Sequence, residues 1–137
     1  MAESALEWEG GCLCGAVRYK ALGTPRWVPH CHCRSCRRAT GAALATYAGY
    51  ERRDFAYTAG APTVFRSSPG VTRSFCERCG TPLSYESSRW PGEVHVFVCT
   101  FDTPEGFTPE AHVFVAEQLP WVHLNDDLPR YRATSGA

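Results

Sequence analysis

The sequence lacks any long apolar segment, and its charges balance. Among its 137 residues, 14 basic side chains match 14 acidic ones, so the formal net charge is zero at neutral pH. A chain without excess positive charge is not expected to bind a nucleic-acid backbone or an anionic membrane surface. No uncharged stretch approaches the length that spans a bilayer, and Met1–Gly10 has no apolar run like that of an export signal. We therefore expect a soluble, cytoplasmic protein.

Several other patterns are missing as well. The sequence has no internal repeat or heptad, and no carboxylate pair or serine–histidine arrangement that would indicate an acid–base centre. Lysine is nearly absent: Lys20 is the only one, and we attribute the preference for arginine to genomic base composition. The length suits one compact domain, so we expect a single domain over residues 1–137.

Cysteine, in contrast, is abundant and clustered. Seven of the eight cysteines form three groups, which are Cys12-x-Cys14, Cys31-x-Cys33-x-x-Cys36 and Cys76-x-x-Cys79. Secreted disulfide scaffolds spread their cysteines along the chain, because close neighbours cannot bridge without strain. The clustering and the absence of an export signal therefore favour metal binding. The two pairs supply four thiols, enough to close a tetrahedral site, whereas the triplet leaves one position open.

The two pairs predict a structural zinc site. Tetrahedral zinc with Zn–S bonds of ~2.3 Å holds its sulfurs about 3.8 Å apart, closer than residues two apart on a straight strand. The chain must therefore bend between Cys12 and Cys14, and the flanking glycines allow it to do so. One ion on Cys12, Cys14, Cys76 and Cys79 would join the N-terminal segment to the middle of the chain. The same ligands would also accept an iron centre.

The triplet Cys31, Cys33 and Cys36 predicts a second metal site with an open position. Three thiolates on zinc leave room for water or an incoming ligand, and a thiol bound there loses its proton. Such a site would hold a thiolate nucleophile at neutral pH. Alternatively, His30, His32 or Cys99 could close the site, or the triplet could bind metal weakly and oxidise.

Three arginines, Arg34, Arg37 and Arg38, accompany the triplet. Their guanidinium groups could offset the charge of a site with four thiolates, or pair with carboxylates of an anionic thiol substrate. They could equally be solvated surface residues. We take all three as candidate substrate-binding residues.

The remaining pattern predicts a mainly β fold of antiparallel sheets. Ten prolines and twelve glycines interrupt the chain often, which suits short strands better than long helices. Strands are expected at Ala16–Ala21, Arg26–His30, Ala43–Ala48, Asp54–Thr58, Thr63–Arg66, Thr72–Phe75, Leu83–Glu86, Glu93–Thr100 and His112–Glu117. One short helix is expected at Ser35–Thr40, with Ser35 able to cap its start and Gly41 its end.

Other aromatic and polar residues have simpler interpretations. We expect the four tryptophans, Trp8, Trp27, Trp90 and Trp121, to lie in the core, as large aromatic residues of small β domains generally do. His95 and His112 lie on apolar strands and are interpreted as structural histidines. Cys99, within the expected strand Glu93–Thr100, is interpreted as a buried apolar residue.

Taken together, the motifs resemble the glutathione-dependent formaldehyde-activating (GFA) family, also called the centromere-protein-V-like domain. The resemblance extends from Gly10 to about Tyr131. It rests on Gly11-Cys12-Leu13-Cys14-Gly15-Ala16-Val17, Cys31-His32-Cys33-Arg34-Ser35-Cys36, Arg73-Ser74-Phe75-Cys76-Glu77-Arg78-Cys79-Gly80-Thr81-Pro82-Leu83, Phe101-Asp102, His112-Val113-Phe114-Val115, Trp121 and Asp127-Leu128-Pro129.

The resemblance implies an Mss4-like fold with a domain core at about residues 10–131. It also implies a structural zinc on Cys12, Cys14, Cys76 and Cys79, and a more labile zinc on Cys31, Cys33 and Cys36. The implied activity joins glutathione and formaldehyde into S-hydroxymethylglutathione, a carbon–sulfur lyase reaction in reverse.

The leading hypothesis is therefore a zinc-dependent carbon–sulfur lyase that acts on a small thiol, such as glutathione, and an aldehyde. Cys31, Cys33 and Cys36 would hold the catalytic zinc. One rival is a non-catalytic zinc domain that binds a protein partner, with a closed triplet and an exposed apolar patch. The other is a thiol redox sensor, in which Cys31 and Cys36 oxidise and release zinc.

Overall fold

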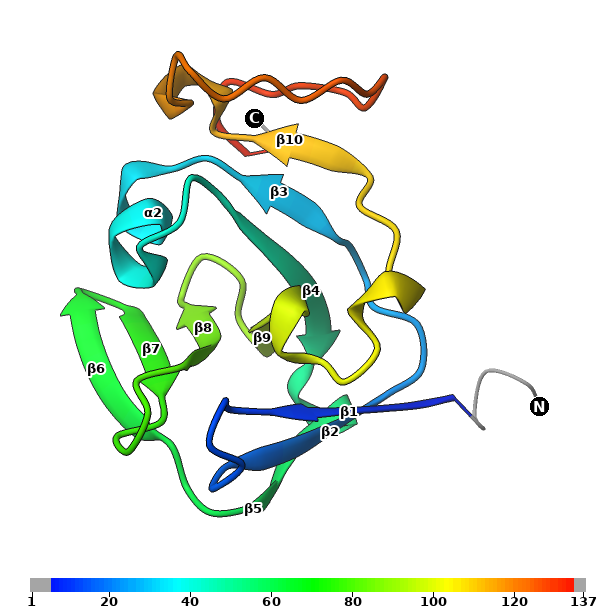
Figure 1. Cartoon of the computed structure of the whole chain (residues 1–137), viewed down its shortest axis with the longest axis vertical. Coiled ribbons are helices and arrows are strands. Elements are labelled where there is room, and N and C mark those ends of the chain that lie inside the picture. The colour runs from blue at the N-terminus through cyan, green and yellow to red at the C-terminus, as the bar shows by residue number, and fades with distance from the viewer. Residues whose placement is uncertain (1–5, 135–137) are drawn as a thin grey trace.

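Two β-sheets form the frame of the protein (Figure 1). The computed structural model describes residues 6–134. The smaller sheet is antiparallel and has the order β1 (Glu7–Gly11), β2 (Arg18–Leu22) and β5 (Phe55–Ala59). The larger sheet has seven strands in the order β10-β3-β4-β9-β8-β7-β6. These are β3 (Pro29–Cys31), β4 (Ala45–Glu51), β6 (Thr63–Ser68), β7 (Val71–Phe75), β8 (Pro82–Ser87), β9 (Glu93–Phe97) and β10 (Ala111–Val113).

The prediction of a mainly β fold with one short helix is confirmed within residues 6–134. Neighbouring strands are antiparallel, except that β10 runs parallel to β3. The larger sheet curves, so that its β6–β7 edge comes round toward the α-helix α2 (Arg34–Thr40) (Figure 1). Because residues 1–5 and 135–137 lie outside the described part, the single domain over 1–137 stays a prediction.

Several strand expectations differ from the structure, among them the expected Arg26–His30, which is observed as β3 at Pro29–Cys31. Strand β1 was not expected, because its sequence Glu-Trp-Glu-Gly-Gly lacks β-branched residues and alternation. The strand expected at Glu93–Thr100 ends at Phe97, since Val98–Thr100 forms a 3₁₀ turn. The strand expected at His112–Glu117 ends at Val113, because Phe114 adopts a left-handed conformation with φ of 57° and a second 3₁₀ turn follows. Cys99 consequently lies exposed on a turn, and its interpretation as a buried strand residue is wrong.

Helix α2 begins one residue earlier than expected and is capped differently. Cys33, and not Ser35, is the N-cap, and its Sγ accepts a hydrogen bond of 3.2 Å from the Cys36 backbone N–H. Gly41 ends the helix as predicted, with φ of 68° and its N–H bonded to the Arg37 carbonyl. A candidate metal ligand therefore also fixes the start of the helix.

Strand β9 separates two buried clusters. Val94 and Val96, together with Val98, face a core that fills the space between the two sheets. Phe97 belongs instead to a second cluster with Cys31, Cys36, Ala45, Tyr47 and Val113. The alternation of side chains along β9 thus directs the valines to the main core and Phe97 to the cysteine triplet.

The tryptophans do not all lie in the core. Trp8 packs against the main core, as expected. Trp121 is 67% exposed, so its expected core position is wrong. It lies between Pro120 and Val122 in a segment without strand or helix, where no sheet face is available to cover it. Trp27 and Trp90 pack on His95 at ring-centroid distances of 5.3 and 5.2 Å.

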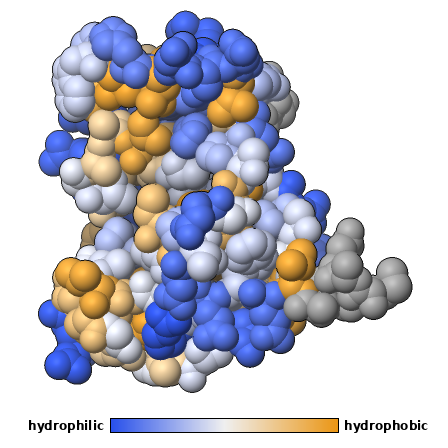
Figure 2. Space-filling model, turned by 45° about the vertical axis from the view of Figure 1, so that its right-hand side comes forward, coloured by the Kyte–Doolittle hydropathy of each residue, from blue (hydrophilic) through white to orange (hydrophobic). Residues whose placement is uncertain are grey.

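The surface carries scattered apolar residues. Figure 2 shows them as separated patches among hydrophilic side chains on the face that it presents. The large exposed ones are Leu6, Leu13, Leu22, Val64, Phe65 and Trp121. Among the described residues, the single α-helix is too short and too polar to cross a bilayer.

Candidate metal centres and cavity

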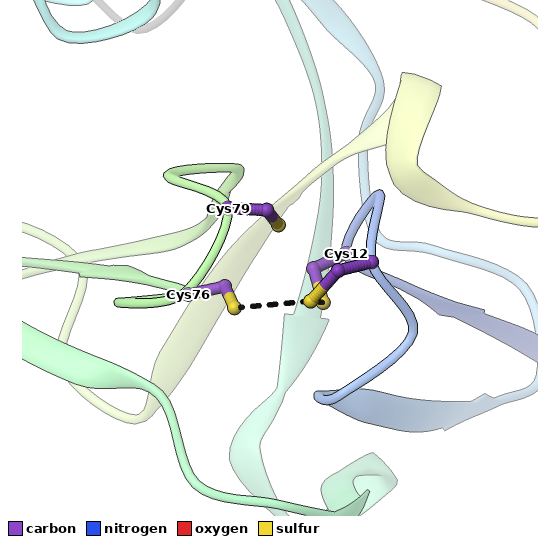
Figure 3. A group of neighbouring side chains, drawn as sticks. Cys12, Cys76 and Cys79 are labelled. Atoms are coloured by element: carbon purple, nitrogen blue, oxygen red, sulfur yellow. Dashed lines mark hydrogen bonds between the residues drawn. The ribbon is translucent and has the colours of Figure 1, made fainter.

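The first cysteine cluster lies where two loops meet. Cys12 and Cys14 lie in the turn between β1 and β2, and Cys76 and Cys79 lie in the turn between β7 and β8. Figure 3 shows the side chains of the two loops pointing toward one another. All four Sγ atoms lie within 4.8 Å of each other. The structure thus brings together the four residues that the sequence pairs predict as ligands.

The spacing of these sulfurs fits a tetrahedral thiolate site. Cys12 Sγ lies 3.6 Å from Cys14 Sγ, which lies 3.8 Å from Cys76 Sγ. Zinc with four thiolate ligands requires about 3.8 Å. The Val17 N–H donates to Cys12 Sγ at 3.3 Å, a contact that favours the ionised sulfur. The donor set therefore fits a zinc ion, which would connect the smaller sheet to the larger one.

Local turns set this geometry. The Gly15 N–H bonds the Cys12 carbonyl at 3.1 Å, and the Gly80 N–H bonds the Cys76 carbonyl at 2.7 Å. Gly80 has φ of 81°, which only glycine adopts without strain. Thr81 links the loops, since its hydroxyl accepts from the Leu13 N–H at 3.1 Å and lies 3.2 Å from Cys79 Sγ.

The second cluster, Cys31, Cys33 and Cys36, forms at the junction of β3 and α2. Cys31 ends β3, Cys33 caps the helix and Cys36 lies in its first turn. The three Sγ atoms lie within 4.8 Å of one another, with 3.6 Å between Cys31 and Cys36. The Tyr47 hydroxyl, on β4, donates to Cys36 Sγ at 3.2 Å. The first helical turn therefore gathers all three thiols.

Ionisation of the three thiols is coupled, because two of them stabilise the thiolate of the third and are then harder to ionise themselves. Cys33 and Cys36 raise the pKa of Cys31, whereas hydrogen bonds from Cys31 and Cys33 lower the pKa of Cys36. Three neighbouring sulfurs cannot all become thiolates unless a cation balances their charge. The donor set is thus suited to a metal that prefers sulfur ligands.

None of the residues considered as a fourth ligand joins the triplet. His30 Nδ1 is hydrogen-bonded to Thr46 Oγ1 at 2.8 Å, and His32 Nε2 to His112 Nδ1 at 2.9 Å. Cys99 is exposed on its turn. Among residues 6–134, the triplet gains no fourth histidine, cysteine or carboxylate ligand. His112 is a structural histidine as interpreted, since it also bonds Asp126 at 2.9 Å.

The triplet opens onto a cavity of about 830 Å³. Aromatic residues from several segments line it, among them Trp27, Tyr47, Tyr85, Trp90 and His95. Trp27, Trp90 and His95 therefore line the cavity and also pack against one another. Their interpretation as core or structural residues did not predict that they line a cavity. Such a volume accommodates a small-molecule ligand.

The predicted arginines take up different positions. Arg38 lines the cavity. The Arg37 guanidinium donates to the carbonyls of His32 and Glu117 at 3.2 and 3.1 Å, and the Arg34 N–H donates to Glu117 Oε1. Neither Arg34 nor Arg37 lines the cavity, so their role in substrate binding stays a prediction.

Two arginines that sequence reasoning missed also line the cavity. Arg73 lies on β7 and Arg89 in the turn after β8, where its guanidinium lies 5.2 Å from the centre of the Trp90 ring. Arg73 had a sequence signal, since it begins one of the motifs that carry the family resemblance, whereas Arg89 had none. The spacing of the cysteines does not show that β7 and β8 approach α2.

Comparisons with known proteins agree with this description. A family model described as glutathione-dependent formaldehyde-activating enzyme matches residues 7–117. A Halomonas elongata protein, provisionally named a glutathione-dependent formaldehyde-activating enzyme, is 30% identical over 127 residues, with 85% of this chain and 80% of that protein covered. An uncharacterized lyase of Schizosaccharomyces pombe is 25% identical over 112 residues, covering 82% of this chain and 81% of the lyase.

A solved structure supports the fold. The crystal structure of a Rhodobacter sphaeroides protein superposes with a TM-score of 0.58 at 23% identity, covering 89% of this chain and 98% of that one. The family match extends over most of the chain and includes all seven clustered cysteines. The chain thus belongs to the glutathione-dependent formaldehyde-activating enzyme family.

Proposed function

We propose that this protein is a zinc-dependent carbon–sulfur lyase. It would form or cleave the S-hydroxymethyl adduct of a small thiol, such as glutathione, with formaldehyde or a related aldehyde. The observation that carries the proposal is the open triplet: three cysteine thiols face a cavity of about 830 Å³, and no fourth ligand among the described residues closes them. The names of the relatives, an aldehyde-activating enzyme and a lyase, support the same reaction class.

In this proposal, Cys31, Cys33 and Cys36 hold a zinc ion, and Cys12, Cys14, Cys76 and Cys79 hold a structural one. When bound at the triplet, zinc would lower the pKa of a substrate thiol so that it reacts as a thiolate near neutral pH. Tyr47 donates to Cys36 Sγ and so fixes the orientation of that ligand. Arg38, at the cavity wall, is placed to attract an anionic thiol.

The rival hypotheses receive less support. A redox sensor needs exposed reactive thiols, but Cys31 and Cys36 are only 6% and 5% exposed. A purely structural domain would be expected to close the triplet with a fourth ligand. The face shown in Figure 2 has separated apolar patches and no continuous apolar surface for a protein partner.

Exchange NMR tests the lyase proposal directly. Formaldehyde and a panel of thiols are mixed, and the rate of adduct interconversion is measured with wild-type protein, with Cys33→Ser and with no protein. We expect the wild type to accelerate exchange for at least one thiol, and Cys33→Ser to lose most of that acceleration because a soft metal ligand is gone. Cys99→Ser, which alters an exposed thiol outside both clusters, is the matched control and should retain the wild-type rate. Uncatalysed rates for wild type with every thiol would refute the proposal.

A further inference from the structure

The cavity contains an arginine that pairs with no carboxylate among residues 6–134. Arg73 projects from β7, and its Nη1 atom is buried without a hydrogen-bond partner. Its Nε atom donates to Ser67 Oγ at 3.3 Å. None of the ion pairs formed among residues 6–134 includes Arg73. A buried guanidinium N–H that stays unsatisfied costs free energy, so such a group indicates a missing acceptor.

The guanidinium of Arg73 lies next to the cysteine triplet. Its Cζ atom lies over the Tyr85 ring, 5.0 Å from the ring centre, in a cation–π contact at the cavity wall. Burial alone would lower the pKa of Arg73, but attraction to Tyr47 and Cys36 outweighs burial and raises it. Arg73 therefore stays charged and within electrostatic reach of Cys36.

The charges that line the cavity favour an anion. Besides the cysteines, its charged side chains are Arg38, Arg73, Arg89 and Glu117. Arg89 is engaged over Trp90, and Arg38 lies on the helix, so Arg73 alone combines a buried, unpartnered N–H with proximity to the thiols. A planar guanidinium in such a site binds anionic oxygens strongly and directionally.

We propose that Arg73 is an anion receptor within the cavity, and that Nη1 binds an anionic oxygen of the ligand whose sulfur lies at the triplet. The inference rests on the proposed function and specifies the ligand class. Two sources would supply such an oxygen. One is a carboxylate of the thiol itself.

The other source is the alkoxide formed in the reaction. When the thiolate sulfur attacks the carbonyl carbon of the aldehyde, a C–S bond forms and the C=O π electrons move to oxygen. The resulting alkoxide would accept a hydrogen bond from Arg73 and then take a proton from water, which gives the S-hydroxymethyl product. In the reverse direction the same contact would stabilise the oxygen before the C–S bond breaks.

Arg73→Met and Arg73→Lys test this proposal in the metal-loaded protein. Arg66→Met, which removes an exposed arginine of β6 that does not line the cavity, is the matched control. Metal per chain is measured first. Calorimetry then gives the affinity for 3-mercaptopropionate, which has a carboxylate, and for 2-mercaptoethanol, which has none, and exchange NMR gives kcat and KM.

Two results would support the proposal and distinguish the sources. If Arg73→Met weakens binding of 3-mercaptopropionate by about ten- to a hundredfold and leaves 2-mercaptoethanol unchanged, the receptor binds a carboxylate. If binding of both thiols is unchanged while kcat falls by a similar factor for both, it binds the alkoxide. Arg73→Lys keeps the charge but loses the planar guanidinium group, so its affinity or kcat should lie between the values of wild type and Arg73→Met. It is also the variant to use if Arg73→Met does not fold.

Two other results would overturn it. Unchanged affinity and rate would show that Arg73 binds no ligand oxygen. A loss of metal with a matching loss of affinity for both thiols would show that Arg73 serves only the cysteine site. If wild type catalyses no exchange, the lyase proposal fails. The test of Arg73 still stands in that case, because it compares how much more tightly wild type and Arg73→Met each bind 3-mercaptopropionate than 2-mercaptoethanol.

Discussion

At the scale of single residues, a chain of hydrogen bonds anchors the segment that carries the cysteine triplet. His32, between two of the triplet cysteines, bonds His112 at 2.9 Å, and His112 bonds Asp126 at 2.9 Å. Because a carboxylate only accepts, the His112 Nε2–H is the donor in the second bond. Arg130 lies 3.2 Å from the same carboxylate. Asp126, which is exposed, thus fixes the orientation of the two buried histidines.

The ionisation of Asp126 gives a pH-dependent prediction. The hydrogen bond from His112, supported by the Leu128 N–H and by Arg130, lowers the pKa of Asp126 to about 2. A carboxyl group with a lowered pKa in the folded state stabilises the protein above its unfolded-state pKa of about 4, and this contribution disappears as the pH falls toward 2.

Asp126→Asn should therefore lower the urea midpoint most at neutral pH, and its difference from wild type should narrow below about pH 4. Urea titrations between pH 3 and pH 7 measure this difference. Asp127→Asn, which alters the neighbouring exposed carboxylate, is the control and should show little effect. A difference that stays constant with pH would contradict the assigned role of Asp126.

At the scale of elements, helix α2 and the cysteine triplet share a residue. The Cys33 sulfur accepts the hydrogen bond from the Cys36 N–H that caps the helix, so a change at Cys33 alters both the ligand set and the cap. Serine is a good N-cap but a poor ligand for a soft metal, and alanine is neither. Two substitutions at one position can therefore separate the two roles.

Cys33→Ser and Cys33→Ala should lose metal from the triplet to the same extent, because both lack the thiolate. Cys33→Ala should be less stable than Cys33→Ser by about 1 kcal/mol, the usual cost of removing an N-cap. Metal analysis and urea denaturation measure the two effects. Equal stability of the variants would show that the contact of 3.2 Å does not cap the helix.

At the scale of the whole molecule, the two cysteine clusters connect different parts of the fold. Cys12, Cys14, Cys76 and Cys79 join a loop of the smaller sheet to a loop of the larger one. Cys31, Cys33 and Cys36 come from neighbouring elements of a single segment. An ion at the first cluster would restrain the contact between sheets, whereas one at the second would restrain only the junction of β3 and α2.

Loss of the first cluster should therefore unfold the chain, and loss of the second should not. Structural zinc contributes about 10–16 kcal/mol of binding free energy, comparable to or larger than the net stability of about 5–15 kcal/mol of ordinary domains. Cys76→Ser should lose the far-UV circular dichroism of the native fold and both ions. Cys36→Ser should keep the native spectrum and one ion per chain. A Cys76→Ser variant with a native spectrum would show that packing alone holds the sheets together.

The sequence by itself determined the close spacing within each cysteine motif, the short-strand character of the chain and the end of the helix. Each depends on residues close together in the chain: a turn with glycine brings Cys76 near Cys79, a first helical turn brings Cys33 near Cys36, and Gly41 ends the helix that follows. Local backbone geometry is set by local sequence, so spacing alone predicts these contacts.

Only the tertiary structure decided what surrounds the triplet. Tyr47, Arg73, Tyr85 and His95 come from four different strands, and the order β4-β9-β8-β7 with the curvature of the sheet brings them to one cavity. Strand order depends on long-range pairing, which no spacing in the sequence reports. The same is true of the 3₁₀ turn that exposes Cys99 and of the histidine contacts that keep His30 and His32 from the triplet. That no fourth metal-binding side chain among the described residues joins the three thiols is thus a property of the fold, although the sequence supplies the thiols themselves.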